Sequence, residues 1–300
     1  MKNINIESPL KIKIKEIFKP NLKKIKEESQ IGKYFLKNIY DIKSGFGDIF
    51  LVINNNEDEY IMKVQKKKIK NKNYILQEYE IYKHLEGSEY ISKYIDYFTC
   101  HNTLHCLILI KYDIDLKKLF NKDRIFFYSK QKKIIKRILK ILEDIHNRGV
   151  VHGDIKFSNI MYNYQEDKIY IIDFGCSRFL DRKFSLKKKR ISGTLRYASL
   201  DSHKGICDNN LNDIESLLYS ILEIEIYPRE LLWKGRYKKY HSTMGRWDKI
   251  YEIKRIFLEK PKVPKKMKKI FKYYKCRQNT KYMRRNNIKF NYDDYINLLE

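Results

Sequence analysis

The sequence predicts an α+β fold in which short strands dominate the first third of the chain and helices the remainder. Apolar residues form short β-like runs up to about Leu109, and amphipathic helical segments follow. Three hundred residues suffice for one large domain or for a domain of two lobes. We expect a basic N-terminal extension at 1–30, a strand-rich N-terminal lobe at about 31–109 and a helical C-terminal lobe at about 114–300.

The expected strands of the N-terminal lobe are short and are separated by polar turns. In chain order they cover residues 38–42, 48–53, 59–64, 94–98 and 104–110. Between the third and fourth strands, residues 73–85 carry apolar side chains at helical spacing, which predicts a helix.

The strongest helical pattern of the C-terminal lobe covers residues 129–147. Apolar side chains, among them Ile134, Ile138 and Leu142, recur on one side of this segment. Further helices are expected at 211–223, 263–274 and 292–299.

Two motifs nineteen positions apart carry groups suited to phosphoryl transfer. Asp154 lies within the segment 152–159, and Asp173 begins the triplet Asp-Phe-Gly. This reaction needs a carboxylate that orients the attacking hydroxyl and accepts its proton, and oxygen ligands for magnesium. Asp154, Asp173 and Asn159 supply these groups in order. A β-hairpin expected between the motifs would place both loops at one cleft.

Several further segments share the pattern of one enzyme family. They are residues 45–50, 152–156, 192–199, 201–205 and 212–217. With the two acidic motifs, this set resembles the protein kinases of the casein kinase 1 superfamily, and within it the vaccinia-related kinases and their poxvirus relatives. The resemblance runs from about Asn38 to near the C-terminus and becomes weaker after Trp233.

The resemblance implies a bilobal protein-kinase fold and a Ser/Thr protein kinase that uses ATP and Mg²⁺. Asp154 would be the catalytic base, and Lys156 would screen charge on the transferring phosphoryl group. Asn159 and Asp173 would hold magnesium.

Two more residues would shape this site. Thr194 would form a hydrogen bond near Asp154 and shape the acceptor site. Asp213 would be buried at the start of a helix and hold the backbone of the catalytic loop, because a buried carboxylate must be satisfied by donors. A plain helix N-cap is the alternative role of Asp213.

On the nucleotide side, the resemblance implies that Lys63 contacts the α- and β-phosphates and that Glu78 pairs with Lys63. A solvated lysine and a surface glutamate are the alternatives. The residues expected to line the nucleotide are Ile42, Gly45, Gly47 and Ile49.

Some positions depart from the family pattern. Ile42 and Ser44 replace glycines of the phosphate loop, and Ile61 stands where a small residue usually packs on adenine. These departures keep a pseudokinase that acts as a regulatory binding module open as the alternative to an active enzyme. Gly153 replaces an arginine that grips a phosphorylated activation loop in many kinases, which indicates activity without such phosphorylation.

The net charge of +27 favours acidic partners. The basic run Lys183–Arg190 would lie in the activation segment and recruit acidic or pre-phosphorylated protein substrates. A weak association with nucleic acid, or a nucleic-acid-binding protein built on a kinase scaffold, is a second interpretation. AT-rich codon usage is a third, since lysine, asparagine and isoleucine abound and Ala198 is the only alanine.

Composition also narrows the setting in which the protein works. Five cysteines without a C-x-x-C spacing argue against a disulfide framework and a zinc site. No apolar run is long enough for a membrane span, and the first residues lack the core of a signal peptide. We expect an intracellular monomer, located in the cytoplasm of the infected host cell if the protein is viral.

Overall fold

The computed structural model divides into two compact units. The first comprises Met1–Gly87 and Ile91–Tyr112, and the second comprises Ser88–Tyr90 and Asp113–Glu300. The structure describes residues 3–4, 30–44, 47–66, 73–100, 104–180, 193–206, 209–234, 243–257, 263–278 and 291–299. The predicted α+β class is confirmed, because the first unit contains a largely antiparallel sheet and the second is mainly helical.

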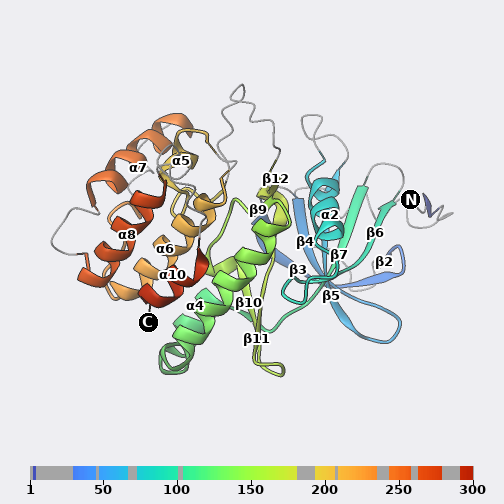
Figure 1. The fold of residues 1–300 in the computed structure, drawn as a ribbon. Helices are drawn as coiled ribbons and strands as arrows, with labels where there is room; N and C mark the ends of the chain where they lie inside the picture. Colours follow the sequence, from blue (N-terminus) through green and yellow to red (C-terminus); the bar gives the residue numbers. More distant parts are fainter. Residues whose placement is uncertain are drawn as a thin grey trace. The chain divides into compact units, whose positions relative to one another are not determined.

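The first unit is built on a sheet that has seven strands in the described residues (Figure 1). In spatial order they are β1 (Asn3–Ile4), β6 (Tyr94–Cys100), β7 (Leu104–Ile110), β5 (Glu59–Lys66), β4 (Gly47–Ile53), β3 (Tyr34–Ser44) and β2 (Gln30–Ile31). Neighbouring strands are antiparallel except for β1 and β6, which are parallel. The five longer strands include the five predicted segments, whereas the two-residue strands β1 and β2 were not predicted.

One helix covers part of this sheet. Helix α2 (Tyr74–His84) contacts β5, β6 and β7, and its buried residues include Ile75 and Ile81 (Figure 1). The helix begins after Asn73, whose side-chain oxygen accepts a hydrogen bond from the Leu76 amide at 2.9 Å. A cluster of buried apolar side chains from the strands stabilises the sheet: Ile31, Tyr34, Leu36, Phe50, Val52, Met62, Val64, Phe98, Cys100, Leu104, Cys106 and Ile108.

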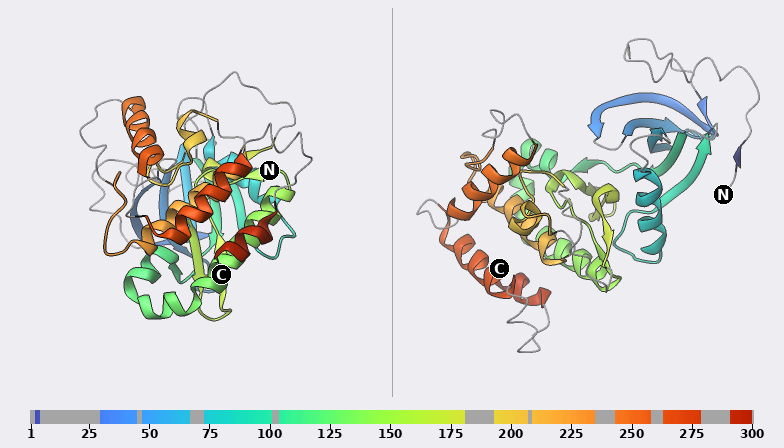
Figure 2. Two further views of the ribbon diagram at one scale, coloured as in Figure 1. Left: turned by 60° about the vertical axis from the view of Figure 1, so that its left-hand side comes forward. Right: turned by 90° about the horizontal axis from the view of Figure 1, so that it is seen from above.

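Helix α6 is almost entirely buried in the second unit and contacts α5 and α8. The described helices are α3 (Leu116–Lys122), α4 (Arg124–Asn147), α5 (Leu200–His203), α6 (Leu211–Glu225), α7 (Thr243–Phe257), α8 (Lys265–Gln278) and α10 (Tyr292–Leu299). Helix α8 contacts α6 and α10, and α10 contacts α4. Helices α7, α8 and α10 are the orange to red helices in Figure 2. Helices α3, α5 and α7 were not predicted.

Helix α4 begins at Arg124 rather than at the predicted Ser129. The reason is local: the Asp123 side chain accepts a hydrogen bond from the Phe126 amide at 2.9 Å and so caps the helix earlier. The apolar stripe that predicted the helix lies in the later turns, so the pattern located the buried face but not the first turns.

Short strands and turns of the second unit position its loops. The predicted hairpin is present as β10 (Ile160–Asn163) paired with β11 (Lys168–Ile171), and β10 also pairs with β8 (Ile114–Asp115). Strand β9 (Val150–Val151) pairs with β12 (Arg178–Phe179). Two 3₁₀ turns complete this region, η2 (Phe157–Asn159) and η3 (Phe174–Cys176).

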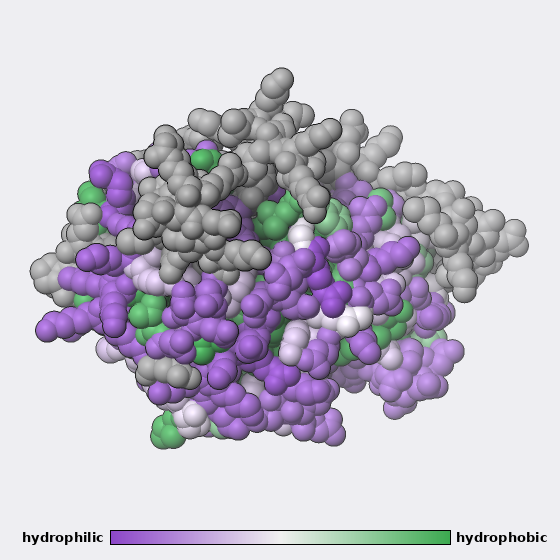
Figure 3. Space-filling model, viewed as in Figure 1, coloured by the Kyte–Doolittle hydropathy of each residue, from purple (hydrophilic) through white to green (hydrophobic). Residues whose placement is uncertain are grey.

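The surface agrees with the polar composition of the chain. On the face shown in Figure 3, hydrophilic side chains cover most of the described surface and hydrophobic ones are scattered between them. None of the described helices combines the length and apolar character that a bilayer crossing requires.

Candidate active site

The carboxylate of Asp154, which lies in the loop after β9, is held from two sides. Asp154 is buried, with only 8% of its surface exposed. Lys156 Nζ donates a hydrogen bond to Asp154 Oδ2 at 2.7 Å, and the Thr194 backbone N–H donates to Oδ1 at 2.6 Å. Lys156 Nζ also donates to Thr194 Oγ1 at 2.7 Å. The three residues therefore form a closed set of charge-assisted hydrogen bonds that fixes the direction of the carboxylate.

Asn159 lies at the end of η2, beside Asp154. Its Nδ2 donates to the Asp154 backbone oxygen at 3.0 Å and to Asp154 Oδ2 at 3.3 Å. This pairing orients the amide so that Oδ1 is left as an acceptor, and no described residue donates a hydrogen bond to it. Asp173 has left-handed backbone angles, φ 69° and ψ 67°, which are uncommon for a residue other than glycine and occur often at functional sites. Amide and carboxylate oxygens of this kind fit Mg²⁺.

The structure brings the two acidic motifs to a common neighbour. The Cys176 thiol has its pKa raised to about 12, first by burial and then by the charges of Asp154 and Asp173. Both carboxylates are therefore close enough to act on one side chain. At neutral pH the thiol is protonated and is a poor nucleophile.

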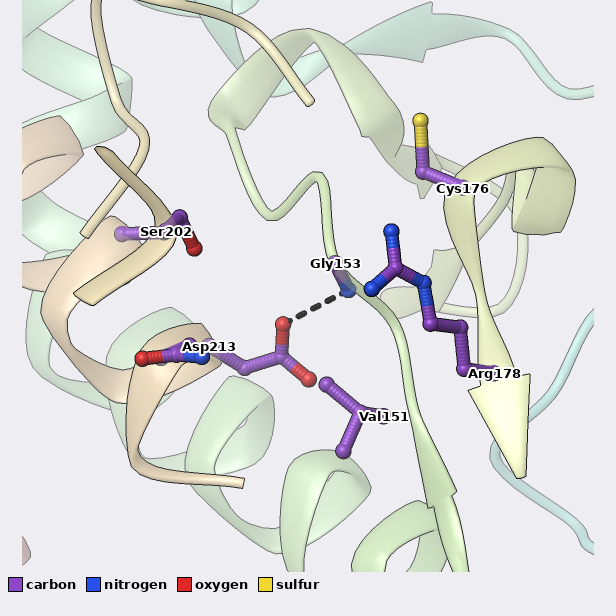
Figure 4. A pocket seen from close by; sticks show the side chains of 8 residues that line it. Val151, Gly153, Cys176, Arg178, Ser202 and Asp213 are labelled. Atoms are coloured by element: carbon purple, nitrogen blue, oxygen red, sulfur yellow. Dashed lines mark hydrogen bonds between the residues drawn. The ribbon is translucent and has the colours of Figure 1, made fainter. Parts of the chain in front are cut away.

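Asp213 holds the backbone of the loop that carries Asp154. It lies on α6, is 0% exposed, and accepts hydrogen bonds at 2.8 Å from the His152 and Gly153 backbone N–H groups. Figure 4 shows the carboxylate directed at Gly153 in a small pocket lined also by Val151 and Arg178. The loop thus takes its position from a helix sixty residues further along the chain.

The charge of Asp213 is also maintained by its partners. Burial by itself would raise the pKa of this carboxyl, but the hydrogen bond and charge of His146, with the Gly153 N–H, lower the pKa below its ordinary value. His146 Nε2 donates to Asp213 Oδ2 at 2.9 Å. Asp213 is therefore an ionised acceptor at the centre of this network and not a helix N-cap.

Two glycines allow two loops to approach closely. Gly153 has φ 77°, and a Cβ there would lie 2.8 Å from the Cys176 backbone oxygen. Gly193 has φ 90°, and a Cβ there would lie 2.5 Å from the Gly153 backbone oxygen. Both positions combine a left-handed backbone with contacts too short for any side chain, so only glycine fits them without rearrangement.

The first unit holds a separate set of predicted residues. Lys63 Nζ and Glu78 Oε1 form an ion pair at 2.7 Å, and both residues are buried. Ile49 is the cross-strand partner of Lys63, so the two side chains share one face of the sheet. A Cβ at Gly47 would lie 2.3 Å from the Val64 backbone oxygen, which explains a glycine at the start of β4.

A known protein family matches most of this chain. A model of the protein kinase domain matches residues 43–285. The chain belongs to the protein kinase family. The kinase is 34% identical over 200 residues to a probable casein kinase I homolog of Encephalitozoon cuniculi (strain GB-M1), covering 64% of this chain and 61% of the relative.

Two further relatives are more distant or shorter in their match. A probable serine/threonine-protein kinase of Fowlpox virus (strain NVSL) is 31% identical over 137 residues, 44% of this chain and 45% of the viral protein. A second probable casein kinase I homolog of E. cuniculi is 28% identical over 230 residues, 73% of this chain and 74% of the relative. The matched regions span only 61% and 45% of the lengths of the first two relatives. The resemblance to casein kinase 1 and poxvirus kinases is confirmed as a distant relationship.

Some predicted features of the kinase lie outside the described residues. Gly45 is one of them, as is the basic run Lys183–Arg190 of the activation segment. The backbone of Ile42 belongs to β3, but its side chain is not among those described. Their proposed roles stay predictions.

Sequence reasoning missed two buried polar residues that support the site. His146 bonds both Asp213 and the Tyr292 hydroxyl of α10. Ser177 Oγ donates to the His152 backbone oxygen at 3.0 Å. One signal was available for His146: it follows Ile145 on the buried side of a strongly amphipathic helix, where a polar side chain requires a partner.

Proposed function

We propose that this protein kinase is a Ser/Thr kinase that transfers the γ-phosphoryl group of ATP to protein hydroxyls, and that residues 31–300 form its kinase domain. The observation that carries the proposal is the closed set of Asp154, Lys156 and Thr194. A carboxylate fixed by a lysine and a backbone N–H is a positioned base beside a positive charge, as phosphoryl transfer requires. The relationship to proteins named as casein kinase I and serine/threonine kinases supports the choice of acceptor.

In the proposed reaction, the oxygen of the acceptor hydroxyl forms a bond to the γ-phosphorus of ATP. Asp154 accepts the proton that this hydroxyl loses. The bond from that phosphorus to the bridging oxygen breaks, and ADP leaves. Lys156 stabilises negative charge on the transferring group. Asn159 Oδ1 and the Asp173 carboxylate would hold Mg²⁺, which neutralises phosphate charge when bound.

We assign nucleotide binding to the first unit. Lys63 would bind the α- and β-phosphates, and Glu78 would hold the lysine in place through their 2.7 Å ion pair. Burial of the pair supports this role, since a lysine on a solvated strand would not need a buried carboxylate partner. Ile42, Gly45, Gly47 and Ile49 are proposed to line the nucleotide.

We further propose acidic or phosphorylated protein substrates. A pocket of about 580 Å³ lies beside Thr194 in the second unit, and its described lining residues include Lys117, Lys156, Arg196 and Arg246 but no aspartate or glutamate. Lys117 and Arg196 share one carboxylate, that of Glu223, at 2.9 and 3.4 Å. Four of the described lining residues are thus cationic, beside the carboxylates of Glu223 and Asp154, and this composition favours anionic partners.

Label transfer from ATP tests this function. Purified protein is incubated with Mg²⁺ and γ-labelled ATP, with casein as an acidic acceptor and a histone as a basic one, beside Asp154→Ala and Asp173→Ala. Wild type should label casein more strongly than the histone. Loss of the base should lower kcat by about 10²–10⁴-fold without loss of folded structure. Equal transfer by wild type and Asp154→Ala would contradict the assignment.

A regulatory pseudokinase is the second candidate. The observation in its favour is Ile61, a partly buried residue of β5 between Leu51 and Leu109 of the neighbouring strands, at a position where related kinases have a smaller residue. A folded wild-type protein that shows neither transfer nor a thermal shift with Mg²⁺ and ATP would favour this candidate.

A further inference from the structure

A buried lysine lies beneath the loop that carries Thr194. Lys254 is on α7 and is 0% exposed, although lysine is rarely buried without a paired carboxylate. No described carboxylate lies within ion-pair distance of its Nζ. The ammonium instead donates hydrogen bonds to the backbone oxygens of Leu195 at 3.2 Å and Ala198 at 2.5 Å.

The surroundings of Lys254 form a specific site for an ammonium group. Nζ lies 4.4 Å from the ring centre of Tyr219 and 5.4 Å from that of Trp233, distances at which aromatic rings attract a cation. Burial lowers the pKa of this ammonium, and the charge of the buried Glu215 opposes that shift in part. The lysine therefore has aromatic and electrostatic partners that partly offset the cost of burying it.

Trp233 holds the same loop through a second contact. Its Nε1 donates a hydrogen bond to the Arg196 backbone oxygen at 2.8 Å. Lys254 and Trp233 together satisfy the backbone oxygens of Leu195, Arg196 and Ala198. These oxygens belong to an irregular turn that has no ladder of its own, so side chains must supply the donors.

The loop fixed in this way faces the proposed acceptor site on its other side. Thr194 supplies the N–H that bonds Asp154, and Arg196 and Tyr197 contribute to the lining of the cationic pocket. A displacement of the loop would therefore change the shape of the pocket. We expect a smaller effect on the residues proposed to bind the nucleotide, because they belong to the other unit.

We propose that Lys254 is a positioning residue for protein-substrate binding, which holds residues 194–198 in the conformation that receives the acceptor protein. The proposal rests on the proposed kinase function for its kinetic consequence. Its structural part, the fixing of the loop, is independent of activity.

Kinetics of two Lys254 variants test the proposal. Lys254→Met removes the donors at similar length, whereas Lys254→Gln keeps two N–H donors without the charge. We expect Lys254→Met to raise the KM for casein about tenfold while the KM for ATP changes less than about twofold, and Lys254→Gln to recover part of the loss. Lys249→Met is the matched control, because Lys249 is exposed on the same helix and should behave as wild type.

Hydrogen exchange supplies a readout that needs no activity. Amide exchange in residues 193–199 should become faster in Lys254→Met and remain unchanged in Lys249→Met. If wild type transfers no phosphate, the proposed function fails, while the exchange result still decides whether Lys254 fixes the loop. Unchanged exchange and an unchanged KM for casein in Lys254→Met would overturn the proposal.

A third variant keeps the test decisive if Lys254→Met does not fold. Trp233→Phe removes only the donor to the Arg196 oxygen and retains an aromatic ring. It should raise the KM for casein about threefold and speed exchange in the same loop. Normal exchange and KM in both Trp233→Phe and Lys254→Gln would contradict the proposed role.

Discussion

The two units hold their predicted site residues in different ways. In the first unit, Lys63 and Glu78 meet through regular structure, since Lys63 lies in a strand paired on both sides and Glu78 lies on a capped helix. In the second unit, Asp154 lies in an irregular loop. That loop depends on Asp213 for its backbone position and on Thr194 for the direction of the carboxylate.

This difference has an energetic consequence. A strand is held by many similar hydrogen bonds, so one side chain contributes little to its position. An irregular loop is held by a few buried polar side chains, each of which leaves unsatisfied backbone groups when it is removed. We therefore expect the site of the second unit to be more sensitive to changes at distant residues than that of the first.

The largest effect is expected for Asp213→Ala. This change leaves the His152 and Gly153 N–H groups buried without their acceptor and removes one of the two partners of His146. The free energy of unfolding should fall by about 3–5 kcal/mol, and phosphate transfer should fall with it. Chemical denaturation measures the stability. The exposed Asp248 provides the control Asp248→Ala, and a similar loss in both variants would contradict the special role of Asp213.

A pH effect of Lys254 should be the next largest. Burial lowers the pKa of its ammonium to about 7 from 10.5, and the Glu215 charge opposes this only in part. Between about pH 7 and 10 the unfolded chain therefore binds more protons than the folded chain, so stability from this residue rises with pH. The unfolding free energy of wild type relative to Lys254→Met should increase by about 2 kcal/mol from about pH 7 to 9.

Two titratable neighbours of Lys254 keep the same protonation state between pH 7 and 9. Burial lowers the pKa of His203 to about 3, so this histidine is neutral throughout the window. Burial also raises the pKa of Tyr219 well above its ordinary value, so its hydroxyl keeps its proton. A difference between wild type and Lys254→Met that stays flat over the window would show that Lys254 does not titrate there.

A smaller effect is expected in the first unit. Glu78→Gln keeps a hydrogen-bond acceptor near Lys63 but removes the charge of the 2.7 Å pair. The KM for ATP should rise about tenfold, equivalent to about 1.4 kcal/mol, with less loss of stability than in Asp213→Ala. Steady-state kinetics at saturating casein measures the change. Glu80→Gln on the exposed side of α2 should leave the KM for ATP unaltered.

The smallest effect is expected for Tyr292→Phe. The change removes the hydroxyl that bonds His146 Nδ1 and retains the ring in its buried position. Stability should fall by about 1 kcal/mol, because His146 keeps its bond to Asp213. Thermal unfolding beside Tyr164→Phe, an exposed tyrosine, measures it. If stability fell as much as in Asp213→Ala, helix α10 would be as important as Asp213 for holding the loop that carries Asp154.

Sequence periodicity predicted the regular elements of both units well, and its failures have physical causes. Helix α7 was missed although Trp247, Ile250 and Phe257 recur at helical spacing. The buried stripe also contains Lys254, which interrupts the apolar pattern from which a helix is recognised. The short helices α3 and α5 offer too few residues for a periodic signal.

The sequence by itself determined the longer strands of the first unit, most of the longer helices, the family, and the chemical types available at Asp154, Asn159 and Asp173. These features depend on residue spacing along the chain, which local propensity and motif order preserve. The chemical roles of those residues are proposals.

Only the tertiary structure decided which polar groups satisfy one another inside the molecule. Asp213 meets a loop sixty residues earlier, and Lys254 meets backbone oxygens 56 and 59 residues earlier. Such partners are chosen by packing, because a buried polar group must bond whatever donor or acceptor the fold brings within reach. No periodic pattern in the sequence records that choice.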